Sequence, residues 1–150
     1  MDHFGEERNM QANVTRVISA GILGTLAMTM VGLFAAPMMG MPAMNPADML
    51  AGAMGGMAIL GWAAHLMIGV VLALIYASVV LTRLPAPPVV RGALFSLAPW
   101  LMAQVVVMPM MGMGLFSGSM TMAFGSLVGH LVYGAVLGAV VGEAVSPGSS

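Results

Sequence analysis

The pentapeptide PMMGM occupies residues 37–41 and recurs letter for letter at residues 109–113, each time directly after a long apolar run. A second shared motif, HLxxGxVL, follows each pentapeptide and begins at His65 and at His130. Both motifs therefore occur twice in the same order, which a chance match does not explain. The sequence predicts two tandem copies of one helix pair.

The composition places these helices in a lipid bilayer. Sixty per cent of the 150 residues are hydrophobic, and only four basic and five acidic residues are present, whereas a soluble domain carries about a quarter charged residues. Four uncharged stretches reach the ~20 residues that a spanning helix needs, and backbone groups in lipid must pair within the segment. These stretches are residues 17–36, 49–81, 93–116 and 120–142. The predicted fold class is an all-α integral membrane four-helix bundle.

The repeat also predicts the topology. Each copy crosses the membrane twice, so both copies enter from the same side, and a parallel pseudo-two-fold axis should relate them. The arginines lie in the N-terminal segment or between the copies, and Glu143 ends the last helix on the same side; these arginines are Arg8, Arg16, Arg83 and Arg91. The loops that carry PMMGM contain only Asp48. By the positive-inside rule, both termini are cytoplasmic and the Met-rich loops face outward.

We expect one transmembrane domain over residues 14–145, between a tail at 1–13 and a tail at 146–150. Repeat one covers about residues 14–81 and repeat two about residues 91–143.

The sequence predicts the local structure of two loops. The proline-rich residues 84–88 predict a stiff connector between the copies. Asn45 with Pro46 predicts a helix start, with Asn as the cap and Pro in the first position. Because residues 49–81 are too long for one span, we expect a short interfacial helix that breaks near Gly55 and Gly56.

His65 and His130 are candidate site residues. Each lies near the middle of its span on a row of small residues at four-residue spacing, which predicts that both face protein rather than lipid. One interpretation is structural: each imidazole bonds a carbonyl or a polar side chain such as Thr29, Gln104 or Ser126. The alternative is that the two imidazoles share a metal ion or ligate a haem b from both sides.

Methionine is the second unusual feature. Sixteen of the 19 methionines lie in residues 28–57 or 102–122, in the outward loops and the helix ends beside them. Thioethers are soft ligands that favour Cu(I), but Met-rich segments also form adaptable surfaces for a partner. The candidate metal ligands are His65, His130, Met38, Met39, Met41, Met44, Met54, Met57, Met110, Met111 and Met113.

Other chemistries lack the residues they need. Cys and Lys are absent from the sequence, and no nucleophile and base are paired with a carboxylate at membrane depth. Nor is there a basic patch, which excludes nucleic acid as a partner. We therefore expect a protein that is not an enzyme.

Three stretches together resemble small bacterial four-helix membrane proteins of an uncharacterised family: GWAAHLMIGVVLALIY (61–76), residues 91–114 with their VVVMPMMGMG, and GHLVYGAVLG (129–138). The resemblance covers most of residues 14–145. It implies a bacterial inner membrane and no assigned activity.

Two functional hypotheses follow. The first is a non-catalytic accessory, assembly or scaffold protein in the bilayer. It would associate with a larger membrane complex or with copies of itself, and its small-residue rows and Met-rich surface would make the contacts. The second is a Cu(I)-handling protein in which the Met-rich loops collect the ion and His65 and His130 bind it inside the membrane.

Overall fold

The computed structural model describes residues 3–81 and 83–142, with side chains from Asn13 onward. All regular structure in this part of the chain is helical. Four spans are long and apolar enough to cross a membrane: Asn13–Met38, Ala58–Val80, Pro88–Met110 and Met120–Val141. The prediction of an all-α fold with four membrane-length helices is confirmed. Glu143 and the tail at 146–150 lie outside the described residues.

Three of the four spans contain a π-helical turn. The first span combines α1 (His3–Met30), the π turn η1 (Val31–Ala35) and α2 (Ala36–Met38), so α1 begins within the stretch predicted as a tail. The second combines α4 (Ala58–Ile75) with η2 (Tyr76–Val80). The third combines α5 (Pro88–Met102), η3 (Ala103–Val107) and α6 (Met108–Met110). The fourth span is α7 (Met120–Val141).

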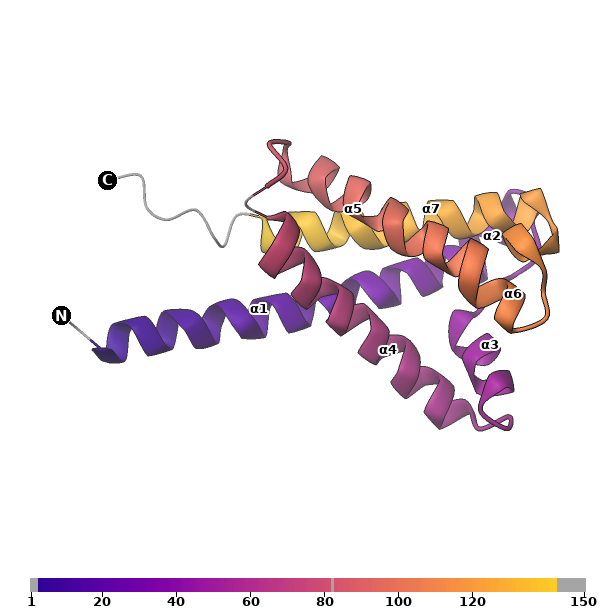
Figure 1. Cartoon of the computed structure of the whole chain (residues 1–150), viewed down its shortest axis with the longest axis horizontal. Helices are drawn as coiled ribbons and strands as arrows, with labels where there is room; N and C mark the ends of the chain where they lie inside the picture. Colours follow the sequence, from indigo (N-terminus) through magenta and orange to yellow (C-terminus); the bar gives the residue numbers. More distant parts are fainter. Residues whose placement is uncertain (1–2, 82, 143–150) are drawn as a thin grey trace.

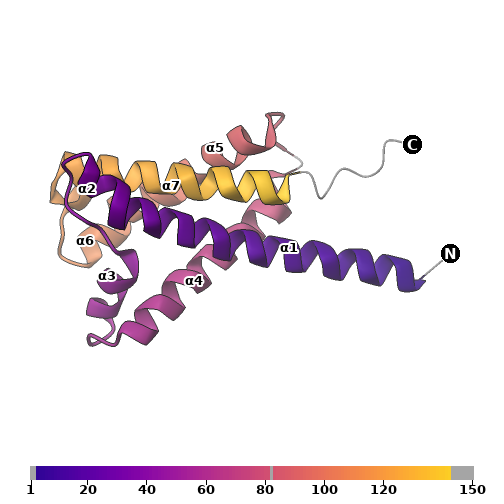
Figure 2. The same ribbon diagram turned by 180° about the vertical axis from the view of Figure 1, so that it is seen from behind.

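The spans alternate in direction, so the described chain ends and the α4–α5 connector lie at one end of the bundle (Figure 1). We call this the arginine end, because Arg16, Arg83 and Arg91 belong to it, and the opposite end, with both PMMGM segments, the methionine end. α4 diverges from α5 and α7 toward the methionine end, as both Figure 1 and the reverse view in Figure 2 show. α4 packs mainly against α1 and α3 and reaches α5 mainly through η2.

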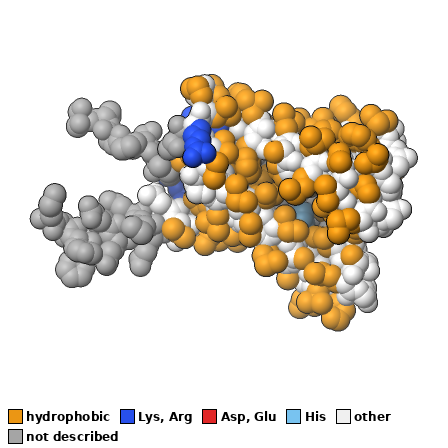
Figure 3. All heavy atoms as spheres, in the orientation of Figure 1, with side chains coloured by type: hydrophobic (Ala, Val, Ile, Leu, Met, Phe, Trp, Pro, Cys, Tyr) orange, Lys and Arg blue, Asp and Glu red, His pale blue; other side chains and the backbone are white. Residues whose placement is uncertain are grey.

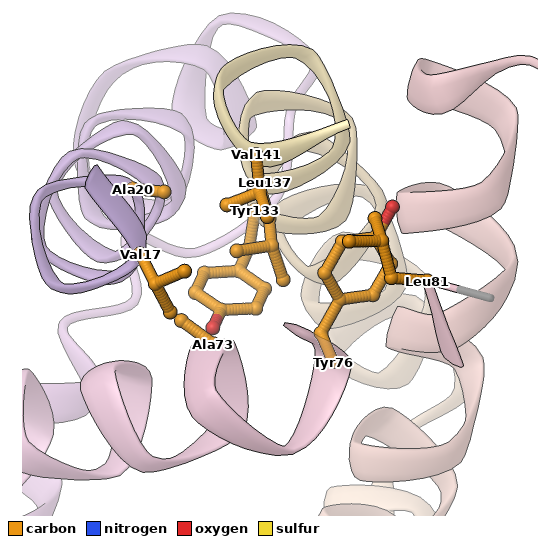
Figure 4. Packing of buried hydrophobic residues seen from close by; sticks show 8 residues of the cluster. All are labelled: Val17, Ala20, Ala73, Tyr76, Leu81, Tyr133, Leu137 and Val141. Carbon is orange, nitrogen blue, oxygen red and sulfur yellow. The ribbon is translucent and has the colours of Figure 1, made fainter. Parts of the chain in front are cut away.

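The arginine end is closely packed. Its core joins residues from α1, α4, η2 and α7 with Leu81 (Figure 4); the cluster contains Val17, Ala20, Ala73, Tyr76, Leu81, Tyr133, Leu137 and Val141. Arg16 Nε donates to the Val140 carbonyl at 2.8 Å, and Arg91 Nη1 donates to the Leu81 carbonyl at 2.9 Å. Each arginine thus satisfies a carbonyl at the end of another helix, where no intrahelical donor is left.

Small residues bring the helices of each hairpin together. Gly69, four residues after His65, packs against Gly21 and Thr25 of α1, and a Cβ there would overlap the Thr25 hydroxyl. In the other hairpin, Gly134 packs against the backbone of Gly92. Close backbone approach is the function of small residues in lipid, where burial from water supplies no driving force.

Each PMMGM ends a helix in a Schellman motif, which explains its glycine. The Met41 N–H donates to the Ala36 carbonyl, and the Gly40 N–H donates to the Pro37 carbonyl, both at 3.0 Å. Gly40 has φ +78°, in the left-handed region where glycine avoids the Cβ penalty. The second copy repeats this pattern, with Gly112 at φ +77°.

The π turns before the pentapeptides reflect the prolines. The Ala36 N–H bonds the Val31 carbonyl, five residues back. Pro37 has no N–H to continue this register, so the Gly32 carbonyl is left free. It accepts instead from the Met44 N–H at 3.0 Å, which ties the loop before α3 to the first span.

The two helix pairs share these local features, but they do not pack against the rest of the bundle in the same way. α7 packs against both α1 and α5, whereas α4 packs against α1 but contacts the α5 span mainly at η2. The two halves are therefore not equivalently placed, and the duplication of an ancestral helix pair stays a prediction.

The short helix predicted before the second span is present as α3 (Pro46–Ala53). The Asn45 side chain accepts from the Ala47 N–H at 3.1 Å and so caps the helix. The chain then breaks at Gly55 and Gly56, which have φ of +75° and +83°, before α4 begins at Ala58.

Candidate functional site

The divergence of α4 leaves a cavity of about 240 Å³ at the methionine end of the bundle. Residues from all four spans and from α3 line it, and none of them is charged. Seven are methionines: Met28, Met44, Met49, Met102, Met108, Met111 and Met122. Seven are polar: Thr25, His65, Gln104, Ser117, Ser126, His130 and Tyr133. In Figure 3 a histidine side chain is visible in a recess among hydrophobic side chains.

His65 comes from α4 and is buried, with 7% of its surface exposed. Its Nε2 lies 3.0 Å from the hydroxyl oxygen of Thr29 on α1. The Thr29 hydroxyl already donates its proton to the Thr25 carbonyl at 2.9 Å, so it must accept from the imidazole. His65 is therefore protonated at Nε2, and Nδ1 carries the lone pair.

His130 comes from α7 and is half-buried. Its Nδ1 lies 2.8 Å from the Ser126 carbonyl, one helical turn earlier. A carbonyl can only accept, so the proton is on Nδ1 and Nε2 carries the lone pair. A backbone carbonyl that fixes the tautomer in this way is a common partner of metal-binding histidines.

A polar chain supports His130 from the third span. Gln104, which is fully buried, donates to the Ser126 hydroxyl at 3.2 Å and accepts from the Ser117 hydroxyl at 2.9 Å. Tyr133 joins α7 to α4, because its hydroxyl donates to the Gly69 carbonyl at 2.7 Å. The hydrogen-bond partners expected for the two histidines are thus found, with Thr29 on His65 and Ser126 on His130.

The structure brings together only part of the predicted ligand set. His65, His130, Met44 and Met111 line the cavity. The remaining seven candidates do not: Met38, Met39, Met41, Met54, Met57, Met110 and Met113.

The surroundings of five of these seven differ. Met38 and Met39 are exposed, whereas Met41 is buried where its sulfur packs over Gly125 on the cavity wall. Met110 and Met113 border a second hollow with Met111.

Five methionines of the cavity are not among the ligands predicted from the sequence: Met28, Met49, Met102, Met108 and Met122. One of them had a usable signal, because Met122 lies two turns before His130 on the same small-residue row. No signal in the sequence marks Met28, since its contact with Gly129 depends on how α1 crosses α7.

Fold and site together define a small four-span α-helical membrane protein with an uncharged cavity of imidazoles and thioethers between its helices. The chain belongs to a family of unknown function, DUF6789, whose model matches residues 11–147. The resemblance to an uncharacterised family is therefore confirmed. No curated protein and no solved structure matches the chain.

Proposed function

We propose that this chain is a non-catalytic protein of the bacterial inner membrane that binds Cu(I) in the His/Met cavity. The observation that carries the proposal is the convergence of His65, His130 and seven methionine side chains, far apart in sequence, on one cavity. The excess of arginine at the end opposite the methionines supports cytoplasmic termini and a cavity near the outer face.

The ligand types favour Cu(I) over harder cations. Thioether sulfur selects soft ions such as Cu(I), and imidazole adds a nitrogen donor that copper also accepts. Among the described residues no three His, Asp or Glu side chains come together, and the cavity lining has no carboxylate to balance a dication. A monovalent soft ion is the species that this uncharged cavity accommodates at the lowest electrostatic cost.

The geometry supports haem b less well. Nε2 of His65 is hydrogen-bonded to the Thr29 hydroxyl. To bind a haem iron, His65 would have to break this hydrogen bond or use Nδ1 as the ligand. The cavity of about 240 Å³ is also below the ~300–1,000 Å³ of pockets for drug-sized ligands, and a haem needs at least that much space.

A scaffold role is the second candidate, and one observation favours it. The third span has the least internal packing, with only 11% of its most apolar window buried, so a large apolar flank is open to another membrane helix. The small-residue rows do not support this role, because Gly69 and Gly134 already pack against helices of the same chain.

Anaerobic titration with Cu(I) against a competing chelator separates the two candidates. The full-length protein in detergent should bind copper stoichiometrically, and the His65→Ala/His130→Ala variant should lose one equivalent or weaken its binding at least ~10-fold. Met38→Leu/Met39→Leu is the matched control, because these exposed methionines line neither hollow. Copper binding that is indifferent to both histidines, together with co-purification of a larger membrane complex, would favour the scaffold.

A further inference from the structure

A second hollow of about 510 Å³ lies between α3 and the second PMMGM segment. Six residues line it, and four of them are methionines: the methionines are Met49, Met110, Met111 and Met113, and the other two residues are Gly52 and Ala53. Met49 comes from α3 and the other three from the helix end and turn after η3. Four thioethers from two separate segments thus surround one hollow at the methionine end of the bundle.

The two hollows adjoin one another. Met49 and Met111 line both the outer hollow and the inner cavity. Met110 is 81% exposed, whereas Met49 and Met111 are half-buried. The exposure of these methionines therefore decreases from the surface toward the His-containing cavity.

Both walls of the outer hollow are fixed by local structure. The Schellman motif orders the second pentapeptide, since the Met113 N–H donates to the Met108 carbonyl at 3.0 Å. The Asn45 cap holds the start of α3, so Met49 lies on an ordered helix. Preorganised walls lower the entropic cost of binding.

Charge also favours a cation here. Asp48, exposed on α3 beside Met49, is the charged side chain that the described residues place at the methionine end. The described arginines lie at the opposite end of the bundle, so they do not oppose a cation that approaches this surface.

We propose that Met49, Met110, Met111 and Met113 form a second, outer site for a soft monovalent cation, through which the inner cavity is loaded. This proposal rests on the proposed function of the inner cavity. The first PMMGM forms no such site, although its backbone is the same, because Met38 and Met39 line neither hollow and Met41 packs onto α7.

Silver(I) tests the outer site, because it is a soft ion without the redox chemistry of copper. Native mass spectrometry of the full-length protein should show two Ag(I) per chain. Met110→Leu/Met113→Leu should bind one Ag(I) and load it more slowly. His65→Ala/His130→Ala should also bind one Ag(I), now at the outer site. Met→Leu conserves volume and apolarity, and Met38→Leu/Met39→Leu, the same change in the other pentapeptide, should bind two.

The outcomes separate the two proposals. If Met110→Leu/Met113→Leu keeps both ions and the wild-type loading rate, the outer site is overturned and the inner site stands. If His65→Ala/His130→Ala binds no silver, no independent outer site exists. If the wild-type chain binds no silver, both proposals fail.

Discussion

The contact between Gly134 and Gly92 predicts a large destabilisation by a single methyl group. A Cβ added at Gly134 would lie 2.7 Å from the carbonyl carbon of Gly92 and 2.8 Å from the Ser96 Cβ, and closer still to the Gly92 oxygen. Backbone atoms cannot rotate away, so α5 and α7 must separate. Overpacking of this kind costs ~1–3 kcal/mol. We expect the upper part of that range, ~2–3 kcal/mol, a reduction of about 30-fold to 140-fold in the folded-to-unfolded ratio.

The assay is reversible unfolding in mixed micelles by titration with sodium dodecyl sulfate, followed by circular dichroism. Gly52→Ala is the matched control, because a Cβ at Gly52 of α3 meets no atom within 4 Å. Alanine is also the better helix former, by ~0.5–1 kcal/mol, so this variant should be neutral or slightly more stable. Equal effects of the two substitutions, or a Gly134→Ala variant as stable as wild type, would refute the close packing of α5 on α7.

Two further predictions concern buried polar groups. Tyr133→Phe removes the hydrogen bond to the Gly69 carbonyl and should lower the free energy of unfolding by ~1 kcal/mol in the same assay. Tyr76→Phe should have the smaller effect, since the Tyr76 hydroxyl makes no hydrogen bond of normal geometry among the described residues and only the Arg91 guanidinium lies near it; the reverse order of the two effects would contradict the hydrogen-bond assignment. In ¹⁵N spectra of histidine-labelled protein, His65 should appear as the Nε2–H tautomer and His130 as the Nδ1–H tautomer. The same tautomer on both rings would disprove this assignment.

Much of the fold is predictable because the bilayer imposes simple rules. Uncharged runs identify the four spans, and Asn45 before Pro46 locates α3. Gly55 and Gly56 mark the break because the chain adopts positive φ there. The divergence of α4 is not predictable in this way, since residues that face lipid and residues that face protein are equally apolar.

The candidate site is predictable only in part, for a related reason. The small-residue rows placed His65 and His130 correctly toward protein, because close helix packing requires such rows. The methionines gave no comparable guide, since their clustering along the chain says which end of a helix they occupy but not which direction they face. Met39 and Met111 occupy the same position in the two copies of the pentapeptide, yet the first is exposed and the second lines the cavity.

Copper K-edge X-ray absorption tests the central claim most directly. The full-length protein, carrying Met110→Leu/Met113→Leu to remove two ligands of the outer site, would be loaded anaerobically with less than one Cu(I) per chain. The predicted spectrum combines thioether sulfur with imidazole nitrogen, and the nitrogen contribution disappears when His65 and His130 are also replaced by alanine. A spectrum without sulfur, or one that is unchanged by the loss of both histidines, would contradict a copper site between these helices.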